Sequence, residues 1–107
     1  MYYTYMLRCA DNSIYTGITT DLNRRMNEHF TKHEKAAKYT HSHTAIKLEI
    51  AWTSENKSLA SKLEYHIKHL NKQNKESLIK NKNLEKYLKN KIDANSYNLI
   101  LNKKIRL

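Results

Sequence analysis

The chain has 107 residues, with one cysteine, one glycine and no proline, and its formal net charge is +10. This length corresponds to one domain, and no apolar run approaches the roughly 20 residues that span a bilayer. A lone cysteine forms no internal disulfide and fits a reducing cytosol, so we expect a cytoplasmic protein with no membrane partner. The charge attracts polyanions, although a solvated, lysine-rich surface explains the charge alone equally well.

Hydrophobic periodicity predicts an α+β fold: a small three-stranded, mostly antiparallel sheet flanked by helices in the order β-β-α-β-α-α, with a helical C-terminal extension. We expect a domain over residues 1–82 and a basic extension over 83–107 that packs on this domain or extends from it. The expected elements are strands at 2–9 and 13–19, a helix at 21–31, a loop at 33–45, a strand at 46–53, a helix from about 56, shorter helices at 74–82 and 84–92, and an apolar segment of ambiguous type at 99–101.

The connection between the first two strands decides where two tyrosines point. A two-residue turn would place Tyr5 and Tyr15 on opposite faces of the sheet. A three-residue loop over residues 11–13 would pair Cys9 with Tyr15 and bring both tyrosines to one face. We predict the longer loop, because a shared site requires it, with Asn12 able to adopt the left-handed conformation.

Alternation along the third strand predicts which of its faces is buried. Apolar residues occupy every second position, which is typical of a half-buried strand. Ile46, Leu48, Ile50 and Trp52 are therefore expected on one face.

Five side chains together have the chemistry that phosphodiester hydrolysis requires. The planar guanidinium of Arg25 suits two phosphate oxygens, and Glu64 can hold one divalent metal ion. Tyr5 or Tyr15 can position or deprotonate a water molecule, provided that a cation lowers the phenol pKa from about 10. His29, one helical turn after Arg25, can accept a proton or orient Tyr5.

Each of these residues also has a purely structural interpretation. Tyrosines in strands usually pack, and Arg25 can pair with an acid of its own helix. A Glu64–Lys68 pair at i, i+4 is the simplest interpretation of an isolated carboxylate. Gly17 can either admit a phosphate or relieve crowding within the sheet. The prediction of a site therefore depends on the combination.

Two histidine pairs raise the question of zinc. The pairs are His41 with His43, and His66 with His69. With one cysteine and no Cys-x-x-Cys motif, we do not expect a structural zinc site. Both pairs are expected at the surface.

An ordered signature extends over several of these elements. The run YYTYMLRCADNSIYTGITTDLNRRMNEHF at residues 2–30, then AKYT at 37–40 and the helix of Glu64, resembles the GIY-YIG nucleases in their small stand-alone branch. The resemblance covers roughly residues 2–79. It implies a three-stranded, largely antiparallel sheet flanked by helices. It also implies DNA cleavage to 5′-phosphate and 3′-hydroxyl ends with one divalent cation, Mg²⁺ or Mn²⁺.

Residue by residue, the resemblance implies a catalytic set. Tyr5 matches the tyrosine of the first family tripeptide, and Tyr15 matches that of the second and would be the general base. Arg25 matches the arginine that grips phosphate, and Glu64 matches the carboxylate that binds metal. His29 falls where the family has a histidine or tyrosine on the helix.

The two tripeptides depart from the family pattern. The first, Tyr3-Thr4-Tyr5, lacks its glycine, and the second is Tyr15-Thr16-Gly17, in which Gly17 matches the closing glycine. Both departures keep the phenols. The side chains expected to contact substrate are Tyr3, Gly17, Arg24, Tyr39 and Lys68.

These observations predict a metal-dependent endonuclease whose partner is nucleic acid, most simply DNA, with the choice between single and double strands left open. The alternative is a non-catalytic nucleic-acid-binding protein on the same scaffold, which would bind in a salt-sensitive manner without cleavage. A third hypothesis is a subunit that docks through residues 99–101 on another protein or a second copy. Monomer and weak dimer both remain open.

Overall fold

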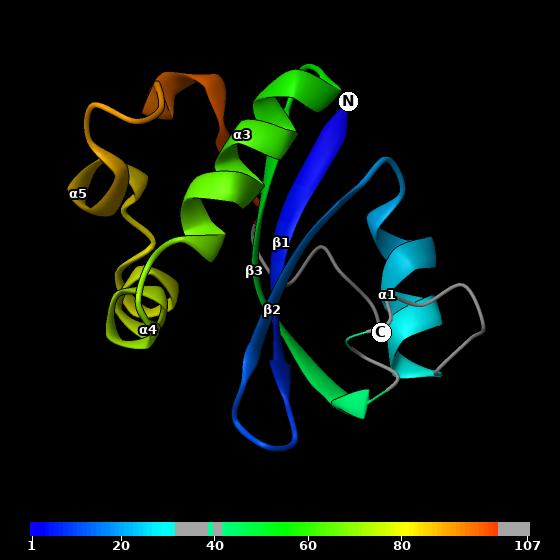
Figure 1. Cartoon of the computed structure of the whole chain (residues 1–107). Coiled ribbons are helices and arrows are strands. Elements are labelled where there is room, and N and C mark those ends of the chain that lie inside the picture. Colours follow the sequence, from blue (N-terminus) through cyan, green and yellow to red (C-terminus); the bar gives the residue numbers. More distant parts are fainter. Residues whose placement is uncertain (32–38, 40–41, 101–107) are drawn as a thin grey trace.

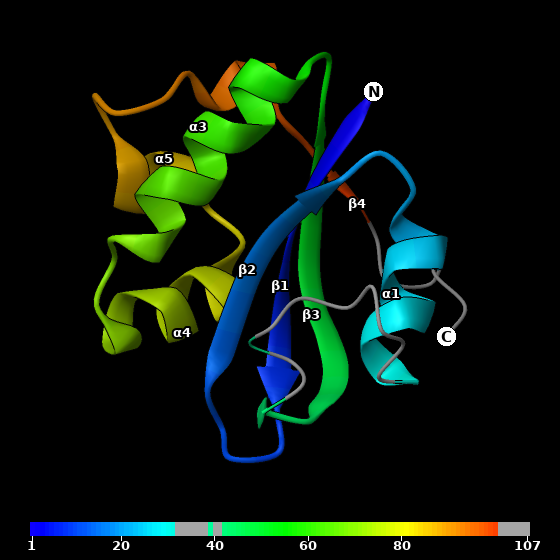
Figure 2. The same ribbon diagram turned by 45° about the vertical axis from the view of Figure 1, so that its right-hand side comes forward.

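The computed structural model describes residues 1–31, 39 and 42–100, and within them it shows a sheet covered on both faces by helices. Helix α1 lies on one face, and α3, α4 and α5 lie on the other (Figures 1 and 2). In this part of the chain no helix is long and apolar enough to cross a membrane. The elements are β1 (Tyr2–Cys9), β2 (Ile14–Thr19), α1 (Leu22–Phe30), β3 (Ala45–Ser54), α3 (Lys57–Lys68), α4 (Lys72–Asn81), α5 (Leu84–Leu88), a 3-10 turn (Ala94–Ser96) and β4 (Asn98–Ile100).

The sheet has four strands among the described residues, in the order β2-β1-β3-β4, and so the predicted three-stranded sheet was one strand short. The additional strand, β4, pairs antiparallel with β3, with Trp52 opposite Leu99 and Ala51 opposite Ile100. It lies in the segment predicted as a helical extension. Three residues are too few to show the alternation that distinguishes a strand from a helix.

Each face of the sheet has its own apolar core. The core under α1 contains Tyr5, Leu7, Leu22, Met26, Ala45, Leu48 and Ala51. The core under α3, α4 and α5 contains Met6, Ile50, Trp52, Leu63, Ile67, Leu78, Leu84, Leu88 and Tyr97. Cys9 is a buried free thiol, as its position at the end of an apolar strand suggests.

A β-bulge on β3 overturns the predicted alternation of that strand. Met6 pairs with Ile50, but Leu7 pairs with Leu48, so Glu49 is an extra residue between them. One inserted residue moves the following side chains to the opposite face. Leu48 therefore packs under α1 while Ile50 packs under α3, and Ile46 is 57% exposed.

The loop between β1 and β2 has three residues, as predicted, but it lies one residue earlier in the chain than predicted. The backbone N–H of Cys9 donates to the oxygen of Ser13 at 2.9 Å, so the three-residue loop is 10–12, and Asn12 in it has a φ of 70°. Leu7, and not Cys9, consequently pairs with Tyr15, and the predicted pairing was wrong by two residues. A shift by two preserves the side-chain face, so the two tyrosines share it as expected.

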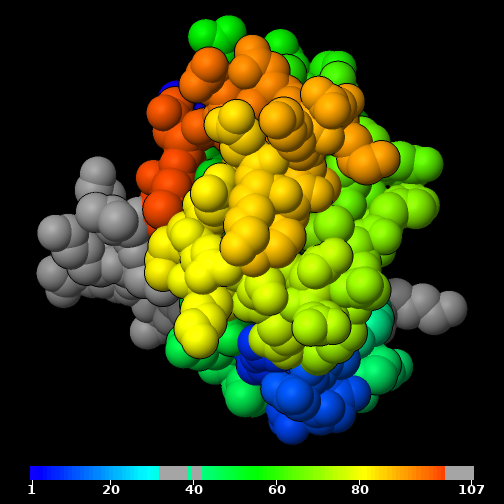
Figure 3. Space-filling view, turned by 90° about the vertical axis from the view of Figure 1, so that its left-hand side faces the viewer, coloured from blue at the N-terminus to red at the C-terminus, as the bar shows by residue number. Residues whose placement is uncertain are grey.

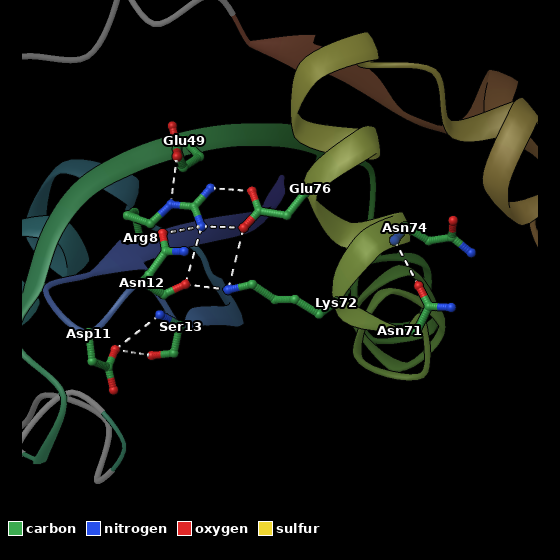
Figure 4. Close-up of polar contacts among 9 residues, drawn as sticks. All are labelled: Arg8, Asp11, Asn12, Ser13, Glu49, Asn71, Lys72, Asn74 and Glu76. Carbon is green, nitrogen blue, oxygen red and sulfur yellow. Dashed lines mark hydrogen bonds and ion pairs between the residues drawn. The ribbon is translucent and has the colours of Figure 1, made fainter.

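An ion-pair network joins the hairpin to both neighbouring elements (Figure 4). Arg8 on β1 donates from Nε to Glu49 on β3 at 3.0 Å and from Nη1 to Glu76 on α4 at 2.6 Å. Lys72 of α4 contacts Glu76 at 3.4 Å and donates to the backbone oxygen of Asn12. Figure 3 shows α4 and α5 covering this side of the molecule, with the hairpin tip below α4. Glu49, the extra residue of the β-bulge, is therefore paired with Arg8.

Replacing the central cation tests this network. We expect Arg8→Ala to lower the free energy of unfolding by about 1–3 kcal/mol, because two partly buried carboxylates lose their guanidinium. Hydrogen bonding by Arg8 holds the pKa of Glu76 below its ordinary value of 4.5. Such a group stabilises the fold above that value, and the stabilisation is lost as pH falls through the folded-state pKa.

Urea denaturation across this pH range measures the effect. Wild type should lose more stability than Arg8→Ala on acidification below the ordinary carboxyl pKa of 4.5. Lys47→Ala is the control, since Lys47 is an exposed cation that also contacts Glu49, at 3.3 Å. An acid response of Arg8→Ala equal to that of wild type would contradict the role of the network.

Candidate active site

Tyr5 and Tyr15 lie side by side on the face of the sheet that α1 covers. Tyr5 is fully buried, Tyr15 is half-buried, and their ring centroids are 6.2 Å apart. The structure therefore brings together the two phenols that the sequence places on different strands.

Gly17 leaves the space that these two rings occupy. A Cβ at this position would lie 2.6 Å from Tyr5 Oη and 2.9 Å from Tyr15 Cε2, both shorter than a van der Waals contact. Gly17 is also opposite Tyr5 in the β1–β2 pairing. Relief of crowding, which was the structural interpretation of this glycine, is what the geometry supports.

His29 extends from α1 into the same group. Its side chain is fully buried, its Nε2 lies 2.7 Å from Tyr5 Oη, and its ring centroid is 5.5 Å from that of Tyr15. Burial, assisted by the charge of Arg25, lowers the pKa of His29 to about 4. The imidazole is therefore neutral at physiological pH and serves as a hydrogen-bonding group toward Tyr5.

Tyr5 stays protonated at physiological pH. Burial raises the pKa of its phenol well above the ordinary value, and the neighbouring Tyr15 and Glu64 raise it further, while Arg25 opposes them. Of the two tyrosines, this one is therefore poorly suited to remove a proton from water.

A buried carboxylate holds two arginines of α1. Glu28 is 6% exposed, and its two oxygens accept from Arg24 at 3.0 Å and from Arg25 at 2.8 Å. The hydrogen bond from Arg25 holds the pKa of Glu28 below its ordinary range. Pairing of Arg25 with Asp21 or Glu28 was the structural interpretation of that arginine, and the contact with Glu28 confirms it. The burial of Glu28 and its second contact, with Arg24, were not predicted, although the i, i+4 spacing was a visible signal.

Glu64 lies on α3, which contacts β2. Its side chain is 23% exposed and lies 3.3 Å from Lys68 Nζ, which itself is 5.8 Å from the centroid of the Tyr15 ring. An i, i+4 pair of this kind contributes only about 0.3–0.5 kcal/mol, so the carboxylate can exchange this partner readily.

The donor set can be tested against a metal ion. Among the described residues, no three histidine, cysteine, aspartate or glutamate side chains are grouped so that they could hold one. Mg²⁺, in contrast, is usually bound through one or two carboxylates, with water and substrate phosphate completing its octahedron. A single accessible carboxylate beside the tyrosines fits that mode, with Glu64 as the protein ligand.

A stack of rings continues outward from Tyr15. Tyr39 stacks on Tyr15 at 5.6 Å and His43 stacks on Tyr39 at 4.1 Å, while His43 Nδ1 lies 2.6 Å from a carboxylate oxygen of Asp11. Tyr39 was predicted to lie near the site, but its link through His43 to the hairpin loop was not. The predicted loop at 33–45 lies largely outside the described residues, and so does His41.

The other residues that were predicted to contact substrate lie in different parts of the structure. Lys68 Nζ lies 5.8 Å from the centroid of the Tyr15 ring, and Arg24 is linked to Arg25 through Glu28. Tyr3, on the same strand as Tyr5, instead lines a separate cavity of about 510 Å³ with Asp21 and Leu99. His69 is exposed, and its ring lies tilted against that of the exposed Tyr65, with centroids 4.1 Å apart.

Comparisons with known proteins give a consistent result. The sequence profile of the GIY-YIG catalytic domain matches residues 1–77. The UPF0213 protein FN1575 of Fusobacterium nucleatum is 46% identical over 78 residues, which are 73% of this chain and 76% of that protein. The UPF0213 protein YhbQ of Salmonella typhimurium is 44% identical over 78 residues, again 73% of this chain and 76% of that protein.

A solved structure is similar as well. The solution NMR structure of the UPF0213 protein BH0048 from Bacillus halodurans is 41% identical to this chain, with a TM-score of 0.50. The match covers 77% of this chain and 86% of that one.

Filling the space at Gly17 should disturb both rings. We expect Gly17→Ala to lower the free energy of unfolding by about 1–3 kcal/mol, because the new methyl group displaces Tyr5 or Tyr15. In a Tyr5→Phe background the nearest atom, the Tyr5 Oη at 2.6 Å, is absent, so the same substitution should cost less. Urea denaturation of the two single variants and the double variant measures the coupling; strictly additive effects would contradict this packing.

The neutral state of His29 has a consequence for pH dependence. Its ordinary pKa of 6.5 applies in the unfolded chain, while burial lowers it to about 4 in the fold. The unfolded state then binds a proton that the folded state does not, so stability falls as pH decreases from 6.5 toward 4.

His29→Gln should reduce this pH dependence. The measurement is the slope of the free energy of unfolding against pH, because the substitution also changes the stability at every pH. NMR of the wild-type His29 ring protons should show a midpoint near 4. A midpoint at the ordinary histidine value would show that the ring is solvated.

Proposed function

Because the chain belongs to the family of GIY-YIG catalytic domains, we propose that it is an endonuclease that hydrolyses phosphodiester bonds of DNA with one divalent cation, Mg²⁺ or Mn²⁺. The observation that carries the proposal is the convergence of Tyr5, Tyr15 and His29 on one face of the sheet, with Glu64 beside them. The net charge of +10 supports a polyanionic substrate, and the buried free Cys9 is in keeping with a cytoplasmic location.

The burial and contacts of each side chain suggest its role in the reaction. Arg25, oriented by Glu28, binds the phosphoryl oxygens and offsets their charge. Tyr15 is the candidate general base, because Tyr5 is held protonated by burial. Neutral His29 orients the Tyr5 hydroxyl through the 2.7 Å contact. Tyr5 in turn packs beside Tyr15, with ring centroids 6.2 Å apart, and helps to hold the general base in place.

Glu64 is the proposed metal ligand. When bound, the divalent cation supplies positive charge to the phosphate and to the departing 3′ oxygen. Glu64 would hold the cation in place of its contact with Lys68, and Lys68 would then be available to the substrate backbone. Because an i, i+4 pair contributes little free energy, losing this contact costs little stability.

One observation favours a second function, a nucleic-acid-binding protein without turnover. The Glu64–Lys68 contact of 3.3 Å already neutralises the carboxylate that the metal would use. If the pair persists on substrate binding, the basic surface binds nucleic acid in a salt-sensitive manner and no bond is cleaved.

Cleavage assays separate the two functions. Labelled single- and double-stranded DNA should be cleaved by wild type with Mg²⁺ or Mn²⁺, and Glu64→Ala and Arg25→Ala should each reduce the rate at least about a hundredfold, because each removes a charge that stabilises the transition state. Lys80→Ala is the control, because it removes an exposed charge from α4, distant from the tyrosines in sequence and layer.

Tyr15→Phe should reduce the cleavage rate as much as Glu64→Ala does, whereas Tyr5→Phe should retain more activity. Equal activity of wild type, Glu64→Ala and Arg25→Ala would reject the assigned roles. Salt-sensitive binding by wild type, with no cleavage under either metal, would favour the non-catalytic function.

A further inference from the structure

A cavity lined by basic residues includes Arg25, which also belongs to the candidate active site. It has a volume of about 390 Å³, and its lining includes Lys57, Arg24, Arg25, Thr19 and Thr20. In Figures 1 and 2 the first turns of α1 and α3 and the C-terminal end of β2 meet at the same end of the sheet. We call this cavity the Lys57 pocket.

The Lys57 pocket has the chemistry of an anion site. Of the residues that the structure describes, three cations line it and no carboxylate does. The buried Glu28 holds Arg24 and Arg25 in place from behind, through contacts of 3.0 and 2.8 Å. The Thr20 hydroxyl adds a neutral donor, whereas that of Thr19 already donates to the backbone oxygen of Asp21 at 3.3 Å. Guanidinium, ammonium and hydroxyl donors around one cavity are the groups that proteins use to hold backbone phosphates.

The pocket is aligned with the proposed metal ligand along α3. Glu64 follows Lys57 by seven residues, which is about two helical turns and about 10 Å, so both side chains leave the same face of the helix. Lys68 continues this stripe, and its Nζ lies near the Tyr15 ring. A chain of anions running along α3 would therefore meet Lys57, Glu64 and Lys68 in order.

We propose that the Lys57 pocket binds a phosphate that flanks the scissile linkage on the same nucleic-acid strand. Lys57 and Arg24 bind this flanking phosphate, while Arg25, at the boundary with the tyrosines, serves the scissile one. The position of the scissile linkage rests on the proposed function; the pocket itself does not. The substrate strand then lies parallel to α3 and must extend beyond the cleavage point to reach Lys57.

Binding without divalent ions tests the pocket independently of catalysis. Fluorescence anisotropy in the presence of a chelator would follow single-stranded DNA of increasing length, starting from one phosphate. Wild type should gain affinity at the length that reaches the pocket. Lys57→Ala and Arg24→Ala should lose this gain and reduce the slope of log affinity against log salt by about 0.7 each.

Lys80→Ala is the matched control, because it removes the same charge from α4 and should keep both the gain and the slope. Lys57→Arg should retain the gain, since it keeps the cation. Lys57 is exposed at the first turn of α3, so its replacement leaves both cores intact, and urea denaturation verifies this. Equal behaviour of Lys57→Ala and Lys80→Ala overturns the proposal.

The outcomes also separate the pocket from the nuclease activity. If wild type cleaves DNA and Lys57→Ala binds like Lys80→Ala, the pocket is rejected while the proposed function stands. If wild type cleaves nothing but Lys57→Ala loses the length-dependent gain, the endonuclease is rejected and the pocket is supported as a phosphate site of a binding protein.

Discussion

The hydrogen bond of 2.7 Å between Tyr5 Oη and His29 Nε2 is the contact from which the rest of the site takes its position. Both side chains are fully buried, and a buried polar atom that loses its partner costs about 1–3 kcal/mol. Together with the packing of Leu22 and Met26 in the same core, the bond therefore helps to hold α1 against the sheet. Arg25 lies one turn earlier on that helix, so its place follows from the same contact. Gly17 completes the arrangement, because any larger residue would occupy the volume of the Tyr5 ring.

In this strongly basic chain, several carboxylates act mainly to orient cations. Glu28 is buried and contacts two arginines, so its contacts persist and the arginines are held ready before any ligand arrives. Glu49 and Glu76 do the same for Arg8 at the other end of the sheet. Glu64 differs because it is partly exposed and has a single weak lysine contact within its own helix. Burial thus distinguishes a carboxylate that supports structure from one that can change partners.

Features that depend only on the alternation of side chains along a strand could be predicted from the sequence. The prediction failed where one inserted residue reversed that alternation. The shared face of Tyr5 and Tyr15 required only the parity of the pairing, so an error of two residues in register did not matter. The bulge at Glu49 changed that parity on β3, and nothing in an alternating pattern marks such an insertion. The partners of Tyr39 and the burial of Glu28 depend on contacts between elements, which local patterns do not encode. The short strand at 98–100 carried too few residues for any period.

The family match ends at residue 77, whereas the sheet is completed by a strand after it. Trp52, in the centre of β3, has Leu99 as its neighbour on β4, and the core around it also takes Leu84, Leu88 and Tyr97 from the same tail. A chain cut after the matched region would leave an open backbone edge on β3 and a large indole exposed to water, both of which promote self-association. Residues 78–100 thus complete the sheet and core of the matched region, and transferring that region alone to another protein would require a substitute strand.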